Sequence, residues 1–130
     1  MWMGKQLAAQ RRGGETAAVG TVSVGGEAPA VVTDGERRQV RIFSPGGYGW
    51  RPSAEDEVLL VGTGQPCIAG RAQSCPVSLA AGEVCLHTTG ATVHLRNNGD
   101  IAVSGTLRLT GDVHISGRLF VGGQEIKGGL

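Results

Sequence analysis

The sequence predicts an all-β protein in which a small OB-type barrel is followed by an intertwined trimeric β-helix. Two observations carry this prediction. Short apolar runs separated by Gly- and Pro-rich turns fill residues 16–79, and a six-residue unit occurs four times without a gap between residues 100 and 123. Four regions follow from these patterns: an N-terminal arm (1–15), the barrel (16–79), a β-helical needle (80–123) and a C-terminal tail (124–130).

Residues 1–15 fit either a short helix that ends at Gly13 or an arm that becomes ordered on a partner, and we favour the arm. The barrel region then predicts five strands, because its apolar residues recur at period two between turn signals such as Asp34-Gly35. The run at 57–62 is almost continuously apolar, so we expect both of its faces to be covered. The five strands are expected at residues 18–24, 28–33, 39–43, 57–62 and 67–70.

In the first of these strands, the alternation places Val19 and Thr21 on one face and Val22 and Val24 on the other. In the third, Val40 and Ile42 are expected to point inward. A loop rich in Gly and Pro separates the third strand from the fourth at residues 44–52.

Residues 74–82 mark the transition to the second region, and two more strands are expected at 83–87 and 91–96 as a hairpin-like pair. The spacing between successive strands then shrinks to six residues. In each six-residue unit the second and fourth residues are aliphatic and the sixth is Gly, which indicates a short strand with one buried face and a sharp bend. The aliphatic residues are Ile101, Val103, Leu107, Leu109, Val113, Ile115, Leu119 and Val121.

Four such units in one chain are too few for a stable stack of coils, which needs about three coils or more. Three chains wound together would supply twelve units around one axis and would remove the open strand edges. We therefore expect a homotrimer in which these eight aliphatic residues form the core.

Composition excludes several other classes. Lys and Arg total 12 and Asp and Glu total 11, so bulk charge does not favour nucleic acid or a membrane surface. Gly accounts for 23 of the 130 residues, against about 7% in an average protein, but without the strict three-residue period of collagen. The N-terminal residues lack a signal-peptide layout, so we expect assembly in a cytoplasm. The three cysteines, Cys67, Cys75 and Cys85, have no metal-like spacing, and we expect free thiols.

Several stretches together carry a family resemblance. Residues 43–52 (FSPGGYGWRP) precede 56–62 (DEVLLVG), and residues 79–87 (LAAGEVCLH) precede 91–105 (ATVHLRNNGDIAVSG). Over residues 17–123 the chain resembles the baseplate spike, or baseplate assembly protein V, of Mu-type contractile-tailed phages. The resemblance implies an OB-fold head and a needle built from three chains, below the tail tube.

From this resemblance we expect a structural protein and not an enzyme. It would cap the tail tube and help to pierce the target cell envelope, in a virion or in a tail-like particle assembled in the host cytoplasm. The implied partners are two further copies of the chain, tail-tube or hub and baseplate proteins, a separate tip protein in some systems, and transiently the target envelope. Related spikes hold iron with a His-x-His motif, but His87, His94 and His114 are isolated here. No cofactor or metal is therefore expected.

Two alternatives were weighed. A hexapeptide-repeat acyltransferase would need many more repeats and a catalytic histidine in a cleft between subunits, and no grouping of catalytic residues supports it. An OB-fold nucleic-acid-binding protein would use Arg37, Arg38 and Arg41 with the aromatic residues Phe43, Tyr48 and Trp50. We expect these aromatic residues to anchor the loop or a subunit contact instead, so no nucleic-acid partner is predicted.

Overall fold

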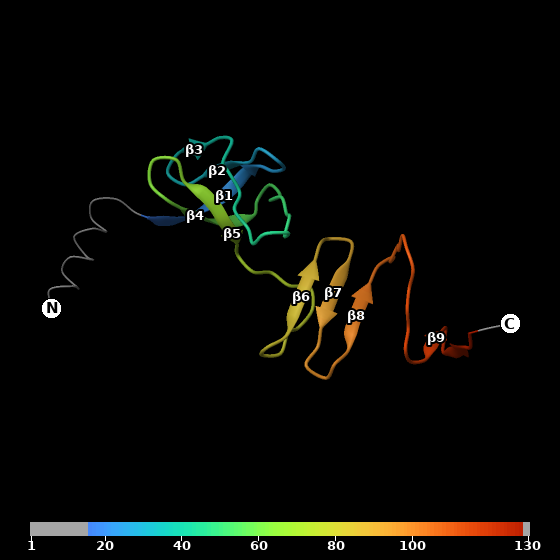
Figure 1. Ribbon diagram of the computed structural model, residues 1–130. Coiled ribbons are helices and arrows are strands. Elements are labelled where there is room, and N and C mark those ends of the chain that lie inside the picture. Colours follow the sequence, from blue (N-terminus) through green and yellow to red (C-terminus); the bar gives the residue numbers. More distant parts are fainter. Residues whose placement is uncertain (1–15, 129–130) are drawn as a thin grey trace. The chain divides into compact units, whose positions relative to one another are not determined.

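The computed structural model describes residues 16–128, and the chain divides into two compact units, Met1–Ser74 and Cys75–Leu130 (Figure 1). The division falls within the predicted transition at 74–82. The expected arm at 1–15 lies outside the described residues. Strands and turns make up the described chain, which contains no helix, so the prediction of an all-β protein is confirmed. It follows that no described segment is a helix able to span a membrane.

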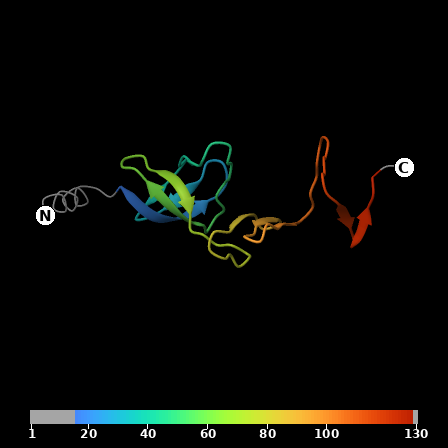
Figure 2. The same ribbon diagram turned by 60° about the horizontal axis from the view of Figure 1, so that its bottom comes forward.

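The first unit is a five-stranded sheet in the order β3-β2-β1-β4-β5, with every neighbouring pair antiparallel. The sheet closes on itself, because residues after β3 pair in parallel with β5 (Figure 2). At this closure the Ile68 amide donates to the Arg41 carbonyl at 2.8 Å, and the Phe43 amide donates to the Ile68 carbonyl at 2.9 Å. The strands are β1 (Ala17–Val24), β2 (Ala30–Val32), β3 (Glu36–Arg37), β4 (Glu57–Val61) and β5 (Cys67–Arg71).

The core of this unit lies inside the closed sheet. Its buried cluster is flanked by the half-buried side chains of Ile42 and Trp50. Along β4 only alternate residues are buried, while Leu59 and Val61 are 42% and 40% exposed. The expectation that both faces of 57–62 are covered is therefore wrong for the single chain, because this strand forms part of the wall of the closed sheet. The cluster consists of Val22, Val31, Val40, Val58, Leu60 and Ile68.

Two strand predictions need correction. Residues 39–43 do not form a continuous strand, because Gln39 adopts a φ of 52° and interrupts the extended chain. Val40 is nevertheless buried and Ile42 packs against the core, as predicted. Val24 is 52% exposed and does not share the buried face of Val22, because the pairing of β1 with β2 shifts register between these two residues.

The second unit contains a three-stranded antiparallel sheet in the order β6-β7-β8 and a separate hairpin of β9 with β10. The predicted pairing of residues 83–87 with 91–96 is confirmed. A turn at Gly122 and Gly123 joins the last two strands, so the expected tail begins as a strand. The strands are β6 (Val84–His87), β7 (Thr92–Leu95), β8 (Ile101–Ser104), β9 (Leu119–Val121) and β10 (Gln124–Ile126).

Between β8 and β9 the described chain is extended, makes no strand pairing, and bends once per six-residue unit. The bends fall at Gly105, Gly111 and Ser116–Gly117, followed by the turn at Gly122–Gly123. Gly105 and Gly111 have φ values of 131° and 119°, which a residue with a Cβ rarely adopts. The prediction that the repeated glycines mark sharp bends is therefore confirmed.

Candidate assembly surface

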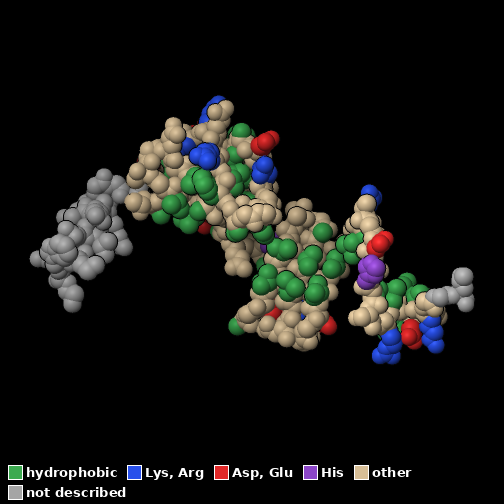
Figure 3. All heavy atoms as spheres, viewed as in Figure 1, with side chains coloured by type: hydrophobic (Ala, Val, Ile, Leu, Met, Phe, Trp, Pro, Cys, Tyr) green, Lys and Arg blue, Asp and Glu red, His purple; other side chains and the backbone are tan. Residues whose placement is uncertain are grey.

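One face of the β6–β8 sheet is apolar and open to solvent. Residues directly opposite each other on neighbouring strands point to the same face. The register aligns Val84, Leu95 and Ile101 in one row and Leu86, Val93 and Val103 in the next. Figure 3 shows hydrophobic side chains gathered over these strands. The exposed fractions of these side chains reach 63% at Ile101, and only Val93 is half-buried.

The opposite face of the same sheet is partly covered by its own chain over β6 and β7, while its β8 residues Ala102 and Ser104 are exposed. His94 points to this face, and its side chain is only 12% exposed because Glu83, just before β6, lies against it with Oε1 3.1 Å from His94 Nε2. Burial raises the pKa of the Cys85 thiol on this face, and a hydrogen bond with the Cys75 side chain raises it further. The Asn97 side-chain amide donates to the Ala81 carbonyl at 2.9 Å. The preceding segment is thus held against β6 and β7 on one face, and the aliphatic face is left open.

Glu83 is the centre of this attachment. Its carboxylate accepts hydrogen bonds from the Asn97 and Ala80 backbone amides, both at 3.0 Å. These bonds, and then the bond with His94, lower the pKa of Glu83 from its ordinary 4.5 to about 2. Glu83 therefore stays ionised at neutral pH and connects the segment before β6 to the turn after β7.

The eight aliphatic residues of the hexads are all exposed. Ile101 and Val103 lie on β8, Leu119 and Val121 lie on β9, and the other four lie on the extended segment between these strands. Their exposed fractions range from 41% at Leu119 to 66% at Leu107. No part of the described chain pairs with the extended segment or covers its aliphatic side chains. This is an unusual density of apolar side chains in solvent for a folded chain.

Sequence reasoning identified Ile101 and Val103 but missed that they continue a larger surface. Four residues of β6 and β7 extend the same face, and their signal was the period-two alternation in the two runs before the hexads. That alternation predicted strands but could not show which face the chain's own residues 75–83 would cover. The additional residues are Val84, Leu86, Val93 and Leu95.

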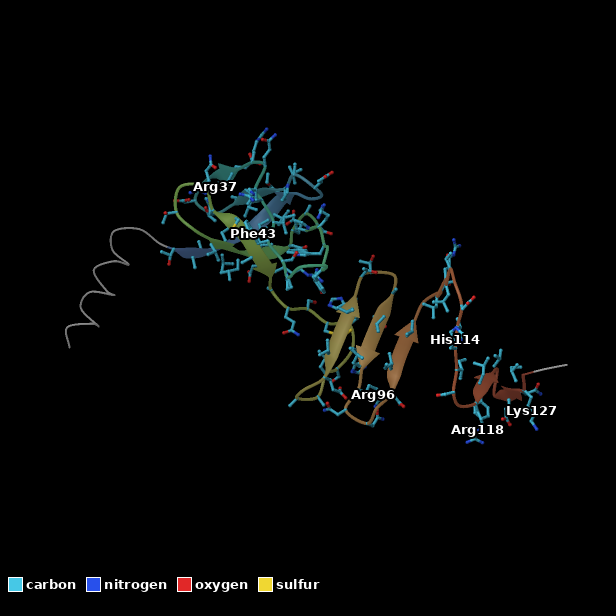
Figure 4. The ribbon with its side chains drawn as sticks, viewed as in Figure 1. Arg37, Phe43, Arg96, His114, Arg118 and Lys127 are labelled. Atoms are coloured by element: carbon cyan, nitrogen blue, oxygen red, sulfur yellow. The ribbon has the colours of Figure 1, made fainter. Side chains whose placement is uncertain are left out.

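The outward third positions of the hexads are Ala102, Arg108 and His114, until the last unit places Phe120 there. Figure 4 shows His114 on the extended segment and Arg118 beside β9. The Arg118 guanidinium lies over the Phe120 ring, 5.6 Å from its centroid, and this ring is 54% exposed. Among residues 16–128 no group of three metal-ligating side chains comes together, around His114 or elsewhere.

The basic and aromatic residues of the first unit divide into two groups. Trp50 packs against the core and has a structural role. Phe43 and Tyr48 are 51% and 50% exposed, and the Arg41 guanidinium covers the Phe43 ring at 5.1 Å from its centroid. The Ser44 hydroxyl donates to the Tyr48 carbonyl at 2.6 Å and fixes the loop. In the described part of this unit, the aromatic rings of Phe43 and Tyr48 therefore remain exposed.

No protein-family model matches the chain, and no curated protein matches it either. The geometry of the two units therefore carries the functional argument.

Proposed function

We propose that the chain is the central spike of a contractile phage tail or a related injection machine. In this proposal three copies form an OB-type head and an intertwined β-helical needle. The head meets the tail-tube or hub and baseplate proteins, and the needle helps to pierce the target cell envelope. The protein acts through its shape and stiffness, without catalysis and without a cofactor.

The observation that carries the proposal is the exposure of all eight hexad aliphatic residues in a segment without strand partners. The chain adopts the expected bends, but each strand-length piece between bends leaves its apolar side in solvent. Three copies arranged around an axis would stack these side chains in layers of three and pair their backbones across chains. The open face of the β6–β8 sheet supports the same arrangement, because it is continuous with the hexads through Ile101 and Val103.

The first unit supports an OB-type head. Its strand order β3-β2-β1-β4-β5, closed by a parallel contact between the chain after β3 and β5, is the arrangement of a five-stranded OB-type barrel. Phe43 and Tyr48 on its surface offer the aromatic contacts that protein interfaces favour. A tail-tube or hub protein is the partner that this proposal assigns to the head.

Mechanically, a spike must resist unfolding when it is pushed. In a needle with cross-chain pairing, failure requires breaking the hydrogen bonds of three chains together. The eight layers would add apolar burial along the whole axis, at about 25 cal/mol for each Å² removed from water. The exposed Phe120 with Arg118 at the far end would suit contact with a tip protein or the envelope.

Two experiments test the proposal at different levels. Light scattering of the purified chain should give the mass of three chains, and a stable monomer would contradict the needle. Antibody labelling of particles from the producing cell, viewed by electron microscopy, should place the protein at the tail end distal to the capsid. A trimer found only outside tail particles would support the trimeric needle but would contradict the proposed role as a tail spike.

A further inference from the structure

The hexad pattern stops at Gly123, but the apolar surface continues beyond it. Counted in the hexad frame, the second and fourth residues of the next unit are Glu125 and Lys127, which are both charged. The aliphatic residue Ile126 lies between them and is therefore out of step with the eight aliphatic residues of the hexads. The turn that joins β9 to β10 explains this change of step.

The turn at Gly122 and Gly123 reverses the chain. Both glycines have positive φ values, 59° and 84°, as the two central residues of a type I′ turn require. Strand β10 then runs antiparallel to β9 and places Ile126 opposite Leu119. Residues opposite each other point to the same face, and alternation along β9 adds Val121 to that face. The hairpin thus returns Ile126 to the side of the hexad aliphatic residues.

The two faces of this hairpin differ in chemistry. The face with Ile126 is aliphatic apart from Gln124, which lies opposite Val121 beside the turn. On the other face Phe120 lies opposite Glu125. Alternation continues this second face to the residues that flank the two strands, Arg118 and Lys127 (Figure 4). The charged residues of the hairpin are therefore all on the face away from Ile126.

The aliphatic face is open in the single chain. The exposed fractions of its side chains are 41% at Leu119, 59% at Val121 and 50% at Ile126. Within the described chain β9 and β10 pair only with each other, and an isolated two-stranded hairpin is marginally stable in water. A contact that covers this face would therefore bury apolar side chains and stabilise the hairpin at the same time.

We propose that the aliphatic face of the β9–β10 hairpin packs against the same face of two further copies of this chain, with Ile126 as part of the contact. The inference rests on the trimer of the proposed function and adds to its core a residue that the hexad pattern does not contain. Leu119 and Val121 make the face continuous with the hexads, which favours a second copy as the occupant. The face suits contact with itself, because equivalent aliphatic side chains would meet around the axis without a buried charge.

Thiol labelling of the assembled chain tests this inference. Glu125→Cys and Ile126→Cys place a new thiol on the outer and on the aliphatic face of the same strand. Trypsin cleavage after Arg118 and Lys127 releases either thiol in the peptide 119–127, in which mass spectrometry reads its labelling. The rate of maleimide labelling in the trimer, divided by the rate in denaturant, should be at least about tenfold lower at position 126 than at position 125. Equal normalised rates in a trimer would overturn the inference and leave the proposed function standing.

A second pair of variants covers the case in which Ile126→Cys does not assemble. Ile126→Thr and Glu125→Thr both place a β-branched residue on β10, which suits a strand. The concentration at which half of the chains are trimeric, measured by light scattering, should rise at least about tenfold in Ile126→Thr and should stay unchanged in Glu125→Thr. Equal midpoints in the two variants would overturn the inference. A monomer in the unchanged protein would contradict the trimer of the proposed function and this inference with it.

Discussion

Changing Leu109 to Asp is the sharpest test of the trimeric needle. Leu109 is the fourth residue of the second hexad, on the extended segment that has no partner within the described chain. In a needle its side chain would meet the same residue of two other copies. The substitution would place three carboxylates at one level of the axis.

The expected loss follows from the exposure of the single chain. Leu109 is 62% exposed, and full burial of a Leu side chain is worth about 1.5–3 kcal/mol, so assembly would gain about 1–2 kcal/mol per chain and about 3–6 kcal/mol per layer. Burying three unpaired carboxylates adds a penalty of several kcal/mol per ion. The lost layer and the three buried carboxylates together offset the gain of several of the eight layers, so the trimer should be lost.

The assay is light scattering combined with thermal unfolding of the purified variant. Thr110→Asp is the matched control, because it adds the same charge at the next residue, which alternation places on the outer face. Leu109→Asp should lose the trimer mass, while Thr110→Asp should keep both the mass and the melting temperature. An unchanged trimer with an unchanged melting temperature in Leu109→Asp would refute the reasoning.

Three further predictions concern other parts of the chain. The folded-state pKa of Glu83 lies below its unfolded value, so the stabilisation of the fold by ionised Glu83 should be complete above about pH 4.5 and should decline as the pH falls toward 2. The melting temperature of Glu83→Gln should therefore fall less over this pH range than that of the unchanged protein. An equal fall in both proteins would contradict the role of Glu83. Gly105→Ala should lower the melting temperature, with a strain of about 1–3 kcal/mol per chain, because φ is 131° and the new Cβ would lie 3.2 Å from Ala91 Cβ. Gly117→Ala meets no atom within 4 Å and should cost less; the reverse order would count against the bend model. Filter binding to single-stranded nucleic acid should be negligible at low salt, whereas a steep salt slope would favour the nucleic-acid alternative.

Much of the fold could be predicted from local patterns. Period-two alternation identified β1, β2, β4, β5 and the pair β6–β7 but not β3, and the repeated glycines identified the bends, because both signals depend only on neighbouring residues. The predictions failed where a backbone conformation was decided by its surroundings. Gln39 interrupts a run that alternates well, and the register shift after Val22 turns Val24 outward.

The candidate surface was predicted only in part, for a similar reason. The sequence by itself determined which hexad residues are aliphatic and that four units are too few for one chain. Only the tertiary structure decided that the chain's own residues 75–83 lie against the His94 face at β6 and β7 and leave the Val84–Leu86 face open. Alternation defines two faces but not which of them is covered, because that depends on contacts between residues that lie apart in the sequence and on the hydrogen bonds that hold them.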